Sequence, residues 1–219
     1  IASTRDVQLF SLRDSNKPQF LAKWTSAFDI RDIALGEGYA ALLDKNAQLQ
    51  VYDLGNLYAP RALAPLPNSR KIDYQSLNLA GDLLLTKAAG RVFVGQAQSP
   101  ELQELTLETP ANLVGVTLDN RAIYLLYKDY LEVRSARAPE QVISRHNHAL
   151  SAVQRVWLDG SRVYLQGGDT LQILQRAALL RGRGEPLLGD LSLPFSAISK
   201  IAVQGELLAW HSGSEIQVF

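Results

Sequence analysis

Histidines are the first residues of this chain that could hold a metal ion or move a proton. His146 and His148 stand two residues apart in Arg145-His146-Asn147-His148, and the third histidine is His211. In an extended segment this spacing places both rings on one face, which suits a divalent metal. A third ligand is needed, and His211 could approach only through the fold. We therefore expect a solvated connector between repeats, with His146 and His148 as weak metal candidates, and no bound metal or cofactor.

Arginines and glycines gather in a second segment, where Arg176, Arg181 and Arg183 lie beside Gly182 and Gly184. A flexible basic loop of this kind could contact an acidic partner, and a solvated loop is the alternative. The segment is too short, and too poor in aromatic residues, for a platform that binds single-stranded nucleic acid. Its apolar part is the best helical candidate of the chain, but it begins on a strand pattern. We expect a strand followed by a long loop over residues 170–183.

Other catalytic patterns are absent from the sequence. It contains no Gly-x-Ser-x-Gly, no phosphate-binding loop and no dinucleotide fingerprint. The acidic turns at Asp44, Asp119 and Asp159 lack the spacing of a calcium loop. With no cysteine, disulfides, thiolate metal sites and a cysteine nucleophile are excluded. We assign no catalytic residue and expect a protein that is not an enzyme.

The composition excludes further classes. The 219 residues include 22 Lys and Arg against 22 Asp and Glu, so the net charge is zero. Domains that bind nucleic acid through bulk electrostatics usually carry a basic excess. Hydrophobic residues make up 47% and charged residues 20%, which is typical of a globular chain rather than a disordered one. No run of 18 apolar residues occurs, so no membrane-spanning helix is expected.

A short apolar pattern repeats along the chain and must position any site. Its first residues are spaced by 42, 43, 39, 40 and 45, and it begins at Val7, Leu49, Val92, Leu131, Leu171 and Ile216. Prolines that follow the first five copies have nearly the same period, with spacings of 42, 40, 39 and 47; they are Pro18, Pro60, Pro100, Pro139 and Pro186. Two markers with one period indicate a structural repeat.

Each period contains four strand-like segments separated by turns. In residues 28–67, for example, Gly36-Glu37-Gly38 separates the first two segments and Asp44-Lys45-Asn46 separates the next two. Four strands in about 40 residues are typical of a β-propeller blade. A β-sandwich is the alternative, but it would not need so constant a period. We predict an all-β propeller in one domain, with blades over about 27–67, 68–109, 110–149, 150–196, and 197–219 plus 1–26.

The first strand of each blade usually lines the central channel of a propeller. The position before its apolar core holds Asp32, Ser76, Gly115, Arg155 and Lys200 in successive blades. Such groups at one mouth of the channel could bind a small anion or a peptide carboxylate. We take Asp32, Arg155 and Lys200 as channel-lining ligand candidates. The alternative is that Asp32 forms salt bridges with Arg155 or Lys200.

A strand that runs into a proline loop occurs at Phe10 to Leu21 and again at Val51-Tyr52-Asp53-Leu54 with Pro60. These segments resemble the LVIVD repeat of bacterial surface and secreted propellers, and the resemblance is clearest over residues 7–67. Asp53 matches the aspartate that ends the strand in that family, and from residue 91 this aspartate is lost. The resemblance implies a propeller in an extracytoplasmic setting, periplasmic or at the cell surface. It implies no catalytic residue.

The two ends of the chain both fall in a third strand. The sequence begins with Ile1 and contains no methionine, so we expect a processed protein or part of a larger one. We expect five blades, with N- and C-terminal strands closing one blade, although one third strand is then surplus; a larger ring completed by further chain is the rival. The function we predict is a non-enzymatic scaffold that binds a protein partner. The alternatives are an enzyme or small-ligand propeller with its site at the channel, and assembly through open strand edges.

Overall fold

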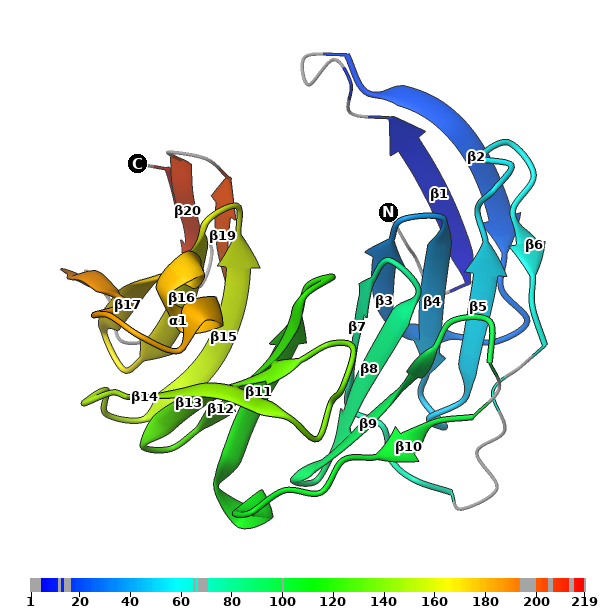
Figure 1. Cartoon of the computed structure of the whole chain (residues 1–219). Coiled ribbons are helices and arrows are strands. Elements are labelled where there is room, and N and C mark those ends of the chain that lie inside the picture. Colours follow the sequence, from blue (N-terminus) through cyan, green and yellow to red (C-terminus); the bar gives the residue numbers. More distant parts are fainter. Residues whose placement is uncertain are drawn as a thin grey trace. The chain divides into compact units, whose positions relative to one another are not determined.

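The computed structural model describes residues 5–11, 13, 17–64, 66, 71–99 and 101–193, together with the backbone of 200–204, 207–212 and 215–218. The chain divides into two compact units, Ile1–Thr106 and Leu107–Phe219. Within each unit, antiparallel sheets follow one another along the chain (Figure 1).

The first unit contains a two-stranded sheet and two four-stranded sheets. The two-stranded sheet is formed by β1 (Asp6–Ser11) and β2 (Gln19–Thr25). The next sheet has the order β3 (Ile30–Gly36), β4 (Tyr39–Asp44), β5 (Leu49–Asp53) and β6 (Arg61–Ala62). The last has the order β7 (Ser76–Ala80), β8 (Leu83–Ala88), β9 (Arg91–Gln96) and β10 (Gln103–Glu104).

The second unit begins with a short 3₁₀ turn, η1 (Pro110–Asn112). One four-stranded sheet follows, with the order β11 (Leu113–Leu118), β12 (Ala122–Tyr127), β13 (Tyr130–Ser135) and β14 (Val142–Asn147). The next has the order β15 (Val153–Asp159), β16 (Arg162–Gly167), β17 (Thr170–Gln175) and β18 (Leu187–Ser192), with the helix α1 (Arg176–Arg181) between its last two strands. A three-stranded sheet of β19 (Lys200–Gln204), β20 (Leu207–Ser212) and β21 (Glu215–Val218) completes the described residues.

The predicted all-β chain of repeated four-stranded antiparallel sheets is confirmed, and the arrangement is propeller-like. The last five copies of the apolar marker lie in the third strand of their sheets, namely β5, β9, β13, β17 and β21, and the first copy lies in β1 of the two-stranded sheet. Irregularities repeat as well, since the register shifts after the third marker residue at Leu9, Val133 and Ile173. The period in the sequence is therefore a period in backbone geometry.

Each core lies between the facing surfaces of two neighbouring sheets. In the first unit, Ala41, Leu43 and Val51 pack with Leu79, Leu84 and Phe93. The inner strands β3 and β7 approach so closely that a Cβ on Gly36 would lie 2.8 Å from the Gly81 carbonyl oxygen. In the second unit, the buried residues of β12 and β13 pack against those of β15, β16, β17 and α1. A lone sheet would leave these faces exposed, so stacking supplies most of the apolar burial.

Two local expectations were wrong. The long loop predicted after the strand at residues 170–175 contains the helix α1, because Ala177, Leu179 and their neighbours are strong helix formers. Gly182 ends this helix in the left-handed conformation, and its N–H donates to the Leu179 carbonyl. The histidine segment, expected to connect two repeats, instead lies in and just after the outer strand β14.

Candidate functional site

Asp32 lies in β3, as predicted for the first strand of its repeat, and its carboxylate binds backbone groups of the first unit. One carboxylate oxygen accepts the N–H of Ile33 at 2.9 Å, and the other accepts the N–H of Leu77 at 2.8 Å. Leu77 belongs to β7, so this half-buried side chain ties β3 to the inner strand of the next sheet. Because both partners of this carboxylate are backbone amides, Asp32 has a structural role: it links β3 to β7 of the neighbouring sheet.

The other two channel candidates, Arg155 and Lys200, lie in different sheets of the second unit. Arg155 lies in β15 of the second unit, is exposed, and follows a register shift between Val153 and Arg155. The same shift occurs on β3 before Asp32 and on β11 before Gly115, which confirms that these positions are equivalent in the repeat. Lys200 begins β19, and its side chain lies outside the described residues.

The histidines are partly buried on β14 and directly after it. A ring nitrogen of His148, Nε2, lies 3.2 Å from the Tyr127 carbonyl oxygen, while Nδ1 is buried without a partner among the described residues. Burial lowers the pKa of both His146 and His148, so their neutral forms are favoured. In the part of the chain that the structure describes, no three His, Cys, Asp or Glu side chains gather to hold a metal ion. The side chain of His211 lies outside that part.

The helix α1 holds the second sheet of this unit against the first. Arg176 at its start forms an ion pair of 2.9 Å with the Asp119 carboxylate, which also accepts the backbone N–H groups of Arg121 and Ala122. Near the other end, the Ser144 hydroxyl on β14 donates to the Leu179 carbonyl at 2.7 Å. The three arginines of the predicted contact loop therefore do not share one environment, because Arg176 is held by its ion pair with Asp119. Arg181 and Arg183 are exposed and have no partner among the described residues.

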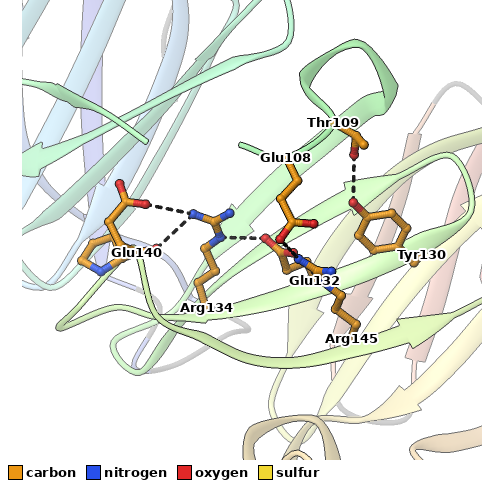
Figure 2. Close-up of polar contacts among 8 residues, drawn as sticks. Glu108, Thr109, Tyr130, Glu132, Arg134, Glu140 and Arg145 are labelled. Carbon is orange, nitrogen blue, oxygen red and sulfur yellow. Dashed lines mark hydrogen bonds and ion pairs between the residues drawn. The ribbon is translucent and has the colours of Figure 1, made fainter. Parts of the chain in front are cut away.

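A charge cluster around the buried Glu132 and Arg134 on the sheet β11–β14 is the main feature that sequence reasoning missed (Figure 2). Glu132 is 1% exposed, and its oxygen Oε1 accepts from Arg134 Nε at 2.7 Å. Its other oxygen accepts from Arg145 Nε at 2.7 Å and forms an ion pair with Arg145 Nη2, also at 2.7 Å. Arg145 also pairs with Glu108 at 2.7 Å, and Arg134 pairs with Glu140 at 3.5 Å. Two guanidinium groups thus lie among three carboxylates.

The electrostatics of this cluster stabilise the charged forms. Glu108 and Glu132 raise the pKa of Arg145, and Arg145 lowers the pKa of Glu108. The Arg145 guanidinium also lies over the Tyr130 ring, whose hydroxyl is 2.9 Å from Thr109 Oγ1 (Figure 2). The cluster joins β13, β14 and the segment before η1. Because arginines bind both oxygens of Glu132, its carboxylate links β13 to β14 and is not arranged as a general base.

The signal for this cluster was present in the repeat itself. The second marker residue is glutamine in four copies and glutamate only at position 132; the glutamines are Gln8, Gln50, Gln172 and Gln217. The Gln50 amide donates to the Leu63 carbonyl, and the Gln172 amide donates to Asp190 at 3.2 Å. A charged residue at this buried place requires opposite charges nearby, which Arg134 and Arg145 provide.

The outer strand β18 presents the second notable surface. Its Leu187, Leu188 and Leu191 side chains are 38%, 56% and 39% exposed. Among the described residues, β18 pairs with β17 alone. Four other outer strands are protected: β6 and β10 have two residues each, β14 is contacted by α1, and β2 carries Lys23 in an ion pair with Asp6. β18 has six residues and no Lys or Arg.

Comparison with known proteins gives evidence about the fold and none about the function. No known family and no curated protein matches the chain. The computationally designed Ika8 protein matches with a TM-score of 0.67 and 14% identity, over 100% of this chain and 69% of that one. The designed Ika4 protein has a TM-score of 0.51 and 14% identity, over 72% of this chain and 98% of that one. Human WBSCR16 has a TM-score of 0.57 and 12% identity, over 85% and 58%. At these identities the likeness shows the fold alone.

Within the described residues, α1 and η1 are the helical segments, and no helix has the length and hydropathy to cross a membrane.

Proposed function

We propose that this protein is a non-enzymatic interaction module that binds an extended protein segment along the outer edge of β18. The observation that carries the proposal is the length and apolar character of that edge, with three partly exposed leucines in six residues. A strand edge offers unpaired N–H and C=O groups, and an added strand satisfies them while its side chains meet the exposed leucines.

The direction of the free backbone groups follows from the pairing with β17. The Leu193 N–H donates to the Asp169 carbonyl, and antiparallel pairs alternate between bonded and non-bonded types. Leu191 therefore bonds to β17, whereas the N–H and C=O groups of Asp190 and Ser192 point away from it. These two residues supply the hydrogen bonds for an incoming strand.

The charges beside this edge favour an acidic partner. Arg181 and Arg183 precede β18, are exposed, and have no ion-pair partner among the described residues. The nearby carboxylate of Asp190 is engaged by Gln172, and Glu185 accepts the N–H of Leu187 at 3.3 Å. Acidic residues flanking the bound strand would be attracted to the two arginines, mainly by steering association.

A defined peptide tests this function. The probe is a fluorescent nine-residue strand of alternating Thr and Val with a Glu at each end, titrated with the full chain and followed by anisotropy. Ser192→Pro removes an outward N–H that β17 does not use, so we expect binding to weaken at least about tenfold. Ser192→Ala keeps that N–H and should bind as the wild type does. Equal binding by both variants would exclude β18 as the site.

We further propose that the sheets close into a five-bladed ring, with the strands of the N-terminal and C-terminal segments sharing one blade. Support comes from the need to satisfy the open edges of the two incomplete terminal sheets, which among the described residues are β1–β2 and β19–β21. Because the chain has no cysteine, Gln8→Cys combined with Gln217→Cys gives a clean test. A cross-link within the monomer supports the shared blade, and a failure to cross-link argues for a different closure.

The setting we propose is extracytoplasmic in a bacterium, periplasmic or at the cell surface. Its support is the resemblance of residues 7–67 to the LVIVD repeat. Immunodetection in fractionated cells of the native host tests it, since recovery in the cytosolic fraction would contradict the proposal.

A further inference from the structure

We propose that the occupant of the β18 edge is β18 of a second copy of this chain, so that two four-stranded sheets continue into one eight-stranded sheet. This inference rests on the proposed function, because it assigns the partner of the same edge. It follows from the order of side chains on the regular part of the strand, Gly189 to Ser192. The register shift near Ile173 lies at the other end of β18.

A two-fold axis at Leu191 satisfies the free backbone groups. An antiparallel copy then places Asp190 opposite the partner's Ser192, and Ser192 opposite the partner's Asp190. These are the residues whose N–H and C=O groups point away from β17, so each pair exchanges two hydrogen bonds and the seam contains about four. A register with the axis at Asp190 would instead place two carboxylates opposite each other, which is unfavourable.

The side chains are complementary in the same register. Leu191, which is 39% exposed, meets the partner's Leu191 at the axis, where a non-bonded pair brings the Cα atoms to about 4.5 Å. Asp190 lies beside a serine hydroxyl, which can donate to its carboxylate. The strand contains no other charged residue, so no like charges meet in this seam. The contact is small, and we expect reversible association in the micromolar range or weaker.

Charge variants at the axis test this pairing. Leu191→Lys and Leu191→Glu each place like charges opposite each other and should sediment as monomers over a concentration series in which the wild type associates. Their equimolar mixture should associate again, since lysine then faces glutamate. Leu35→Lys, at a residue 59% exposed on β3, is the matched control and should associate like the wild type. A wild-type chain that stays monomeric up to about 0.5 mM, or a mixture that does not associate, overturns the proposal.

A cysteine provides a second readout. Leu191→Cys introduces the chain's only thiol, and the expected Cα separation lies in the range for a disulfide. It should form a disulfide-linked dimer at least about tenfold faster than Phe20→Cys, whose position on β2 is 54% exposed. Equal rates would overturn the pairing. If the chain is monomeric but the acidic Thr-Val peptide still binds and Ser192→Pro still prevents this, the proposed function holds and the self-pairing fails.

Discussion

Glu132 and Arg134, two residues apart on β13, form an ion pair of 2.7 Å whose side chains are only 1% and 3% exposed. Such a pair is costly to desolvate, and Arg145, Glu108 and Glu140 supply further ion pairs around it. The pair lies where other repeats place a glutamine or an apolar residue. This ion pair therefore distinguishes the sheet β11–β14 from its neighbours, whose sequences place no charged residue at these positions.

The first prediction concerns this buried charge. Glu132→Gln restores the residue usual at this position but leaves Arg134 and Arg145 short of one anion in a buried place. We expect a loss of roughly 3 kcal/mol in the free energy of unfolding, measured by urea denaturation of the full chain. Glu101→Gln, at an exposed position, should remain within about 0.5 kcal/mol of the wild type. Equal stability of the two variants would show that the cluster does not clamp the sheet.

The junction made by α1 gives a second prediction. Gly182 has φ of 65°, and a Cβ there would lie 2.8 Å from the Ile143 carbonyl oxygen. Gly184 has φ of 85° but no atom within 4 Å of such a Cβ. Both Gly→Ala variants carry the strain of a left-handed backbone, and Gly182→Ala must also displace β14. We expect it to be less stable than Gly184→Ala by roughly 1–2 kcal/mol in thermal and urea unfolding. The reverse order would refute the close approach.

The histidines predict a pH dependence. Burial lowers the pKa values of His146 and His148 in the folded state, so the unfolded state binds more protons once the pH falls below about 6.5. Stability should therefore be fully present above that pH and decline as the pH falls from about 6.5 toward the folded pKa values. Urea unfolding at pH 7.5 and pH 5.8 measures the decline in the wild type and in the variant carrying His146→Gln and His148→Gln. A decline of the same size in both would contradict this origin.

Asp32 supplies a prediction that separates a structural role from a ligand-binding one. Asp32→Ala leaves the N–H of the buried Leu77 without its acceptor, so we expect a loss of roughly 1–3 kcal/mol in unfolding free energy. Asp82→Ala, at an exposed turn, should change stability by less than about 0.5 kcal/mol. If Asp32→Ala proves as stable as Asp82→Ala, the structural role of Asp32 is wrong, and the hypothesis that Asp32 binds a ligand in the channel regains support.

The sequence predicted the repeat well because its markers are tied to backbone geometry. Marker segments such as Leu131 to Val133, whose first and third residues are apolar, must lie in a buried strand, and the proline after each of the first five copies precedes an outer strand. Helix α1 was missed because a helix of six residues depends on packing, here of Ala178 and Leu179, more than on its own pattern.

The candidate site was harder to predict because it depends on cross-strand register. Glu132 faces Arg145 only through the pairing of β13 with β14, across a separation of 13 residues. The sequence does not mark the leucines of β18 as exposed, since an apolar strand can be buried or on an edge. Only the order of strands in the sheet decides between these two environments.

Amide hydrogen exchange at residues 187–192 tests the central claim most directly. In dilute protein, the amides of Asp190 and Ser192 should exchange rapidly, because they point away from β17, while that of Leu191 should be protected. Raising the protein concentration or adding the acidic Thr-Val peptide should slow exchange at Asp190 and Ser192 by at least about tenfold. If these two amides are already protected in the dilute chain, or exchange at the same rate under all three conditions, β18 is not the binding edge.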